Sequence, residues 1–335
     1  MSIQFSVILA TRNRPALFAE ALASVLAQGD ARLEVVVVAD GCEPALLPDY
    51  EAIWTKAVSA APIQVIRLPV SPRGHGQSHA LNMGVAAARG DYVAFLDDDD
   101  AWTDPGYLCR LAALLAASPE PPDLLLADQA AFRDGVPAPG PIWIEDLGER
   151  LARRGPAVAE GGYRVTPAEL LTAHGFCHLN TTVVRRALFL EIGGLDESIR
   201  YECDRDFYLR AIDVAARIVY RPGVVSRHNI PDPARQASMS TAVSALEKRV
   251  FQLRVLDRGI LFARDPAIRS HAHRHKGYVL QAIAEELARR GRFAAAGAYA
   301  REALAFGRGP KWAAYAAYLS LRGLFSGGER RAAAD

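Results

Sequence analysis

Residues 91–102 read DYVAFLDDDDAW, an apolar run that ends directly in four aspartates. An apolar run of this length is typical of a buried strand. Four adjacent carboxylates repel one another and burial raises their pKa values, so a hard divalent cation is the usual partner. Because residues i and i+2 of an extended segment face the same way, Asp97 and Asp99 are expected to share one ligand. The motif favours Mg²⁺ or Mn²⁺ over a solvated acidic loop.

Strands and helices alternate around this motif. The expected strands are the apolar runs at 3–10, 33–39, 63–68, 91–96, 123–132 and 180–186. The expected helices, in which apolar residues recur at helical spacing, are 15–28, 76–89, 187–192 and 204–216. A strand and then a loop are expected over 217–231. Strands that are apolar on both faces and alternate with helices indicate an α/β fold, with a mostly parallel sheet covered on both faces.

Polar residues follow several of these strands. They are Thr11, Arg12 and Asn13 after the first strand, Asp40 after the second, and Asp97–Asp100 after the strand at 91–96. Ligands of such sheets bind at the carboxyl ends of the strands, so these residues are expected to converge on one cleft. Asp40 has two interpretations: a carboxylate that accepts a hydrogen bond from a nucleobase, or half of an Asp-Gly turn.

The later part of the chain changes in composition. Residues 133–167 are rich in Pro, Gly and charge and are expected to form a long surface excursion, with a lid over the cleft as one role. We expect two domains, 1–235 and 240–335. The expected helices of the second domain are 241–263, 276–290, 293–306 and 311–324, and the last two have the rhythm of a tetratricopeptide-like pair.

Charge is spread unevenly along the chain. The net charge is +1, yet residues 240–335 contain 17 Lys and Arg against 8 Asp and Glu. This imbalance suggests that the second domain meets something anionic. For the apolar and basic segment 311–331 we keep three roles open: contact with a membrane surface, a cap on the helical appendage, or an oligomer contact in a homodimer.

Composition excludes several protein classes. The chain has 335 residues, of which 50% are hydrophobic and 23% charged, as in ordinary globular proteins rather than disordered ones. It contains no apolar run of the ~18–20 residues that span a bilayer, and its first residues do not resemble a signal peptide. We expect a cytoplasmic protein, with peripheral association at the inner membrane face as an option. The four scattered cysteines are expected to be free thiols.

Four blocks of sequence, taken together, resemble the family 2 glycosyltransferases over roughly residues 3–228. They are SVILATRNRP (6–15), VVVVADGCE (35–43), GQSHALNMGVAAARGDYVAFLDDDDAW (76–102) and GGLDESIRYECDRDFYLRA (193–211). The resemblance implies a GT-A fold, Rossmann-like, here with a C-terminal α-helical appendage. It also implies inverting, metal-assisted sugar transfer from a nucleotide-diphosphate donor to a hydroxyl group.

The resemblance further implies the partners of the reaction. The first expectation for the donor is a UDP-sugar, and the acceptor is expected to be a saccharide or a lipid-linked molecule. The setting would be bacterial surface polysaccharide or lipopolysaccharide synthesis, and no nucleic-acid partner is expected. The alternative is a catalytically inactive GT-A scaffold that binds partners through its C-terminal helices.

The resemblance also assigns roles to residues. The nucleotide would be held by Ala10, Thr11, Asn13 and Asp40. Within the metal motif, Asp99 and Asp97 would bind Mn²⁺ or Mg²⁺, and Asp98 would reach the ribose. His228 would meet the metal or the pyrophosphate, with a hydrogen-bonding role in its loop as the alternative. From their place in the Gly-rich loop at the helix 76–89, and not from the resemblance, His75 and His79 are expected to contact the diphosphate. In this chain Ala39 replaces the first acid of the nucleotide block, and Leu81 stands where many members have Arg.

Asp204 is the expected catalytic base. The family's Glu-Asp pair corresponds to Cys203 and Asp204, so only the second acid remains. Glu202 is the alternative base, and Asp206 is expected to be structural. His178 lies next to Cys177, but no ligand set with suitable spacing surrounds them, so zinc is not expected.

Overall fold

The chain forms two compact units, residues 1–235 and 236–335. The computed structural model describes residues 3–29, 32–133, 135–154, 158–230, 243–307 and 309–329. Among these residues, no helix has the length and apolar character needed to cross a membrane.

One sheet with strand order β3-β2-β1-β4-β9-β6-β10-β5 organises the N-terminal unit. Its strands are β1 (Phe5–Thr11), β2 (Leu33–Ala39), β3 (Ile63–Arg67), β4 (Tyr92–Phe95), β5 (Ala101–Trp102), β6 (Leu124–Arg133), β9 (Thr182–Arg185) and β10 (Ile218–Asn229). The pairs among β3, β2, β1 and β4, and the long β6–β10 pair, are parallel. β9 lies antiparallel between β4 and β6. The sheet is therefore mostly parallel, as expected.

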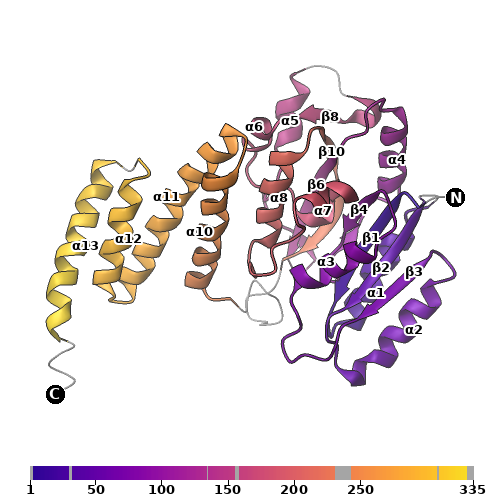
Figure 1. Cartoon of the computed structure of the whole chain (residues 1–335), viewed down its shortest axis with the longest axis horizontal. Helices are drawn as coiled ribbons and strands as arrows, with labels where there is room; N and C mark the ends of the chain where they lie inside the picture. The colour runs from indigo at the N-terminus through magenta and orange to yellow at the C-terminus, as the bar shows by residue number, and fades with distance from the viewer. Residues whose placement is uncertain are drawn as a thin grey trace. The chain divides into compact units, whose positions relative to one another are not determined.

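Helices cover both faces of this sheet (Figure 1). On one face lie α1 (Pro15–Leu26), α2 (Leu47–Ala57) and α4 (Tyr107–Ala117), whose buried side chains share a core with alternate residues of β1 and β2. On the other face lie α3 (Gln77–Ala87), α7 (Arg186–Glu191) and α8 (Cys203–Val214). There Phe95 of β4, Phe189 of α7 and Phe207 of α8 form an aromatic cluster. Because successive side chains of a strand point to opposite faces of the sheet, each strand contributes apolar residues to both cores.

Several elements differ from the sequence expectation. Helices α2 and α4 were not expected. The segment 133–167, expected to be a long surface excursion, contains β7 (Val136–Pro137), α5 (Leu147–Ala152) and β8 (Tyr163–Val165), with α6 (Pro167–Leu170) at its end. Trp143, Ile144 and Leu147 are buried, which fixes part of the segment against the sheet. The strand and loop expected over 217–231 are one strand as far as Asn229, with register shifts that bend it after Arg221 and Val224.

In the part of the C-terminal unit that the structure describes, residues 243–307 and 309–329, there are four helices: α10 (Ala245–Phe262), α11 (Pro266–Arg289), α12 (Phe293–Leu304) and α13 (Pro310–Glu329). Their shared core contains Leu256, Ile283, Leu287, Ala300 and Leu319. Helix α11 begins ten residues before the expected start at 276, because the Asp265 side chain caps the Ala267 amide and Pro266 occupies the first turn. The helical appendage predicted by apolar spacing is confirmed.

An ion pair between the buried Glu34 and the exposed Arg89 joins β2 to the loop before β4. Glu34 is fully buried, and its carboxylate accepts hydrogen bonds from Ser6 Oγ at 2.7 Å, from the Arg89 backbone at 2.7 Å and from Arg89 Nε and Nη2 at 2.8 and 2.6 Å. Burial raises the pKa of Glu34, but these donors outweigh it and hold the pKa below its usual value. Charge-assisted hydrogen bonds of this kind stabilise the folded state by ~1.5–3 kcal/mol.

We therefore predict that Glu34→Gln lowers the free energy of unfolding by about 2 kcal/mol at pH 7. Since the folded-state pKa is depressed, the stabilisation is complete above the unfolded pKa of about 4.3 and is lost as the pH falls through the folded value. Urea titrations at pH 7 and at lower pH should show the two proteins converging in acid. Glu51→Gln is the control, because Glu51 and its partner Arg67 are about half exposed. A Glu34 variant no less stable than this control would contradict the analysis.

Candidate functional site

The four aspartates after β4 are held by groups from other elements. Arg14, at the start of α1, forms ion pairs with Asp98 and Asp99. Thr11, at the end of β1, donates its hydroxyl to Asp98 at 2.6 Å. Asp98 is only 1% exposed, and burial raises its pKa to about 6 although Arg14 and Thr11 oppose this. The ends of β1 and β4 therefore meet, as the sequence predicted.

Asp100 is the most completely bonded member of the group. It accepts from Asn180 Nδ2 at 2.5 Å, from His228 Nδ1 at 2.7 Å and from the Asn229 backbone at 2.7 Å. Burial lowers the pKa of His228, but its hydrogen bond to Asp100 and the neighbouring carboxylates raise it above the usual value overall. His228 is thus tied to the acidic loop through Asp100. Asn180 Oδ1 also accepts from the Asp97 backbone at 3.0 Å, which fixes the start of the loop.

Asp97 faces the loop that follows Asp40. Gln77, in the first turn of α3, donates to Asp97 Oδ1 at 2.7 Å. The two residues before Gln77 donate their backbone amides to Asp40, His75 at 2.7 Å and Gly76 at 3.1 Å. Asp40 therefore orders the turn into α3, and this turn places Gln77 against Asp97. The ends of β2 and β4 are linked in this way.

Oxygen atoms of Asp97, Asp99 and Asp100 lie within 4.8 Å of one another. Burial, followed by the charges of Asp100 and Asp99, raises the pKa of Asp97 well above its usual value. The raised pKa shows that the anionic form of Asp97 is unfavourable beside the other two carboxylates. A nearby positive charge would stabilise that anionic form. An all-oxygen donor set is the one that Mg²⁺ and Mn²⁺ prefer. The residues present therefore fit a hard divalent cation.

Asp204 faces this acidic loop across His178. His178 Nε2 lies 3.6 Å from Asp204 Oδ2 and 3.9 Å from Asp97 Oδ2. Its Nδ1 accepts the Asn180 backbone amide at 3.3 Å, so a neutral ring carries its proton on Nε2 and directs it toward the carboxylates. Burial lowers the pKa of His178, which favours that neutral form. Trp143 packs edge-on against the rings of His178 and His228, at centroid distances of 5.9 and 5.1 Å.

Other predicted site residues have different immediate partners. Asn13 has a φ of +56° and exchanges two hydrogen bonds with Glu43. His75 Nε2 lies 2.9 Å from the Pro69 carbonyl, and His79 Nδ1 lies 3.0 Å from Glu197. Ala10, the penultimate residue of β1, pairs in register with Val38. Asn13 and His75 thus lie at the loop that contains Asp40 and Glu43, whereas the His79 side chain pairs with Glu197 in the loop before α8.

The structure adds residues that the sequence analysis did not assign to the site. They are Arg14, Trp143, His178 and Asn180, through the contacts described above, and Asp100, which was expected in the cleft, gains a role that the sequence analysis did not give it. Asp100 and Arg14 stood inside quoted motifs, so a signal for them existed. His178 and Asn180 precede a strand rather than follow one, and Trp143 lies in the Pro- and Gly-rich segment.

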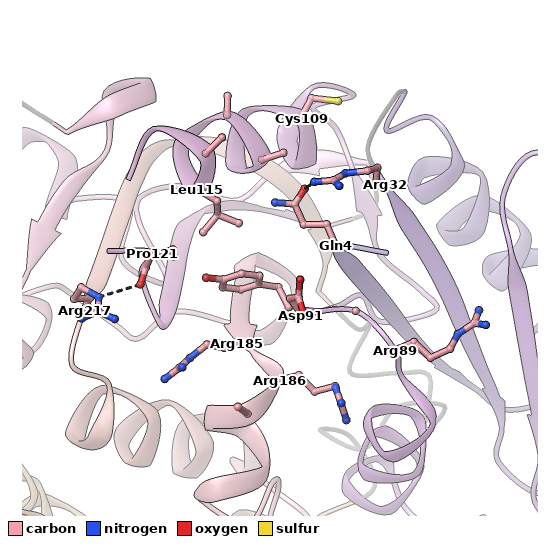
Figure 2. Close-up of a pocket in the computed structure, with 16 residues that line it drawn as sticks. Gln4, Arg32, Arg89, Asp91, Cys109, Leu115, Pro121, Arg185, Arg186 and Arg217 are labelled. Atoms are coloured by element: carbon pink, nitrogen blue, oxygen red, sulfur yellow. Dashed lines mark hydrogen bonds between the residues drawn. The ribbon is translucent and has the colours of Figure 1, made fainter. Parts of the chain in front are cut away.

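A second hollow lies at the opposite, amino-terminal edge of the parallel strands (Figure 2). Its volume is about 940 Å³, and its lining includes Arg32, Arg89, Arg185, Arg186 and Arg217. Carboxylates pair with three of these cations: Glu34 with Arg89, Asp123 with Arg185 and Glu120 with Arg217. The acidic loop is not part of its lining. This hollow is therefore separate from the predicted site.

Part of the chain matches a known family. Residues 6–123 match the model of glycosyl transferase family 2. An uncharacterized glycosyltransferase of Nostoc sp. is 34% identical over 116 residues, which are 35% of this chain and 34% of that protein. The succinoglycan biosynthesis protein ExoO of Rhizobium meliloti is 37% identical over 93 residues, which are 28% of this chain and 24% of that protein. The matched region thus spans about a third or less of these two relatives.

Solved structures match most of the chain. The structure of S. aureus TarS 1–349 in complex with UDP-GlcNAc has a TM-score of 0.66 at 20% identity, over 89% of this chain and 81% of that one. The mannosyltransferase PcManGT from Pyrobaculum calidifontis, in complex with GDP-Man and Mn²⁺, has a TM-score of 0.59 at 19% identity, over 96% and 81%. At such identities the likeness shows the fold alone. The GT-A fold expected from the sequence is confirmed.

The two aspartates in the first turn of α8 have different surroundings. Asp206 is 1% exposed and forms an ion pair with Arg210 at 2.7 Å, whereas the Asp204 side chain is 21% exposed. Removing one partner of a buried pair typically costs ~3–5 kcal/mol. We predict that Asp206→Ala destabilises the protein by about 3 kcal/mol and that Asp204→Ala changes its stability by less than about 1 kcal/mol. Equal losses in urea titrations would contradict the structural role of Asp206.

Proposed function

Because residues 6–123 belong to glycosyl transferase family 2, we propose that the chain transfers a sugar from a nucleotide-diphosphate donor to a hydroxyl group. The observation that carries this proposal is the group of Asp97, Asp99 and Asp100 with Asp204 beside it, linked by His178. A cation site for a diphosphate and a carboxylate for a hydroxyl proton are the two functions that such a transfer needs. The solved complexes of similar fold with UDP-GlcNAc and with GDP-Man and Mn²⁺ support a nucleotide-sugar donor.

The nucleotide half of the donor belongs at the ends of β1 and β2. Asp40 accepts two backbone amides, and the remaining lone pairs of its carboxylate are available for a nucleobase N–H. The side chains of Thr11 and Asp98 bind each other, so we assign them to shaping this wall of the pocket. Ala10 and Asn13 complete it through the backbone at the end of β1. His75 and His79, in the turn before and the first turn of α3, are proposed to face the diphosphate.

Mn²⁺ or Mg²⁺ is proposed to bind Asp97, Asp99 and Asp100, with His228 behind Asp100. Such an ion neutralises the charge of a diphosphate leaving group. In this chain Arg14 holds Asp99 from one side and His228 holds Asp100 from the other, so two of the three carboxylates are oriented in advance. Orienting a ligand set in this way raises its affinity for the ion.

Asp204 is proposed as the general base. An acceptor hydroxyl gives its proton to Asp204 Oδ2 while its oxygen forms a bond to the anomeric carbon. The bond from that carbon to the phosphate oxygen breaks at the same time, and the nucleoside diphosphate leaves with the electron pair. One displacement from the opposite side inverts the anomeric centre. A positioned base of this kind contributes ~10²–10⁴ in rate.

His178 is proposed as a positioning residue for Asp204. Its Nε2–H points between Asp204 and Asp97, and Asn180 and Trp143 fix the ring. At 3.6 Å from Asp204 Oδ2, this N–H lies just beyond hydrogen-bond distance, so we propose that its dipole orients the Asp204 carboxylate and leaves the lone pairs for the acceptor hydroxyl. A saccharide or lipid-linked acceptor in surface polysaccharide synthesis is the setting we propose, and the match to ExoO supports it.

The donor class can be tested by thermal shift. We predict that one of UDP, GDP and dTDP raises the melting temperature of the full chain by about 5 °C when Mn²⁺ is present at saturating nucleotide. Asp99→Ala should abolish the metal-dependent part. Asp49→Ala, which removes an exposed carboxylate of α2, should retain it. If no nucleotide binds under any condition, the inactive scaffold becomes the better interpretation.

The base and its positioning residue can be tested together by release of nucleotide from the donor that binds. Asp204→Asn should lower kcat by ~10²–10⁴ and retain metal-dependent nucleotide binding. His178→Phe, which keeps a ring against Trp143, should lower kcat about tenfold, and His178→Gln, which keeps an N–H donor, should restore part of it. In the Asp204→Asn background, His178→Phe should have no further effect. Additive losses would show that His178 acts independently of Asp204.

A further inference from the structure

Helix α13 is the last described helix of the C-terminal unit, and its inner face is closely packed. Ala316 and Leu319 are 1% and 0% exposed. A Cβ on Gly323 would stand 2.7 Å from Ala294 Cα, and one on Gly297 would stand 3.0 Å from Ser320 Cα. Only glycine allows the backbones of α12 and α13 to approach this closely. The inner face of α13 is therefore packed against α12.

The opposite face of α13 is also apolar. Tyr318, Leu321, Leu324 and Phe325 are 48%, 57%, 76% and 79% exposed. They recur at three- and four-residue spacing, so they form one stripe along the helix, which we call the α13 stripe. A helix face that stays in contact with water normally carries polar side chains. A helix with apolar side chains on both faces is instead built to be covered on both.

The charges beside the α13 stripe indicate what covers it. Residues 310–328 contain no carboxylate and two cations, Lys311 and Arg322, which lie on one flank of the stripe at helical spacing. Arg322 donates to the Tyr318 hydroxyl at 3.2 Å and lies 4.3 Å from the centroid of the Phe293 ring, so its guanidinium is held at the border of the stripe. Apolar side chains edged by cations are typical of helices that lie in a lipid–water interface.

The charge of the whole unit distinguishes between two occupants. Residues 240–335 contain 17 Lys and Arg against 8 Asp and Glu. A second copy of the chain would bring two such units together and oppose like charges, whereas anionic headgroups attract them. We propose that the α13 stripe lies on an anionic phospholipid surface, with its apolar side chains among the acyl chains and Lys311 and Arg322 at the level of the phosphates. This proposal does not depend on the chemistry of the N-terminal unit.

Vesicle sedimentation with the full chain tests the proposal. We expect the protein to bind vesicles of phosphatidylcholine with phosphatidylglycerol in low salt, to bind pure phosphatidylcholine at least tenfold more weakly, and to be released by 0.5 M NaCl. Leu321→Glu/Leu324→Glu should weaken binding to the anionic vesicles by more than about tenfold, because two inserted leucines are replaced by carboxylates. Both positions are exposed, so the fold should persist, and circular dichroism checks this.

Val58→Glu/Leu190→Glu is the matched control, since it makes the same change at exposed apolar positions of the N-terminal unit. It should bind the vesicles as the unmodified protein does. Light scattering after gel filtration measures the oligomeric state and so tests the competing occupant, a second copy of the chain. A dimer that Leu321→Glu/Leu324→Glu dissociates, with no binding to vesicles, would assign the stripe to a second copy and overturn the proposal. Absence of vesicle binding, or equal binding by the stripe variant, would also overturn it. Lys311→Glu, which leaves the apolar side chains intact, should weaken binding even if the double variant fails to fold.

Discussion

Four consecutive carboxylates, of which Asp98 and Asp100 are buried, can stand at the end of a strand only if other groups hydrogen-bond or neutralise them. In this protein, each partner comes from a different element. Arg14 immediately precedes α1, Asn180 precedes β9, His228 is the penultimate residue of β10 and Gln77 begins α3. The acidic loop therefore fixes several loops against one another. Because these contacts satisfy Asp98 and Asp100 most fully, the unfavourable charge is concentrated at Asp97, beside the carboxylate of Asp99.

The direction of β9 decides which residues can reach this loop. β9 runs antiparallel between β4 and β6, so its first residues lie at the edge where its neighbours end. His178 and Asn180 immediately precede it and thereby join the carboxyl-end cluster. In a wholly parallel sheet, these positions would lie at the opposite edge, near the arginine-lined hollow. One reversed strand thus brings the segment before it to the candidate site and gives Asp204 its neighbour.

The same reversal explains what the sequence could and could not predict. Asp40 and the acidic loop were found because each follows an apolar run, which is a local signal. His178 was set aside as half of an unsuitable zinc set, since no local pattern shows that β9 is antiparallel. Trp143 was hidden in a segment whose Pro and Gly content suggested only a surface excursion. Helix α4 differs from these cases, because Leu108, Leu111 and Leu115 have helical spacing. Its signal was present in the sequence but was not interpreted.

The register of α8 assigns its carboxylates to different tasks. Residues two apart on a helix point to nearly opposite sides. Asp204 therefore faces His178, while Asp206 faces Arg210, which also bonds the Ile192 carbonyl at the end of α7. Cys203, where the resemblance has a Glu, is 6% exposed, so a carboxylate there would need a partner of its own. A thiol needs none, because cysteine packs as a small hydrophobic residue. The loss of the family's first acid therefore leaves the fold intact and leaves Asp204 as the acid that α8 directs toward the acidic loop.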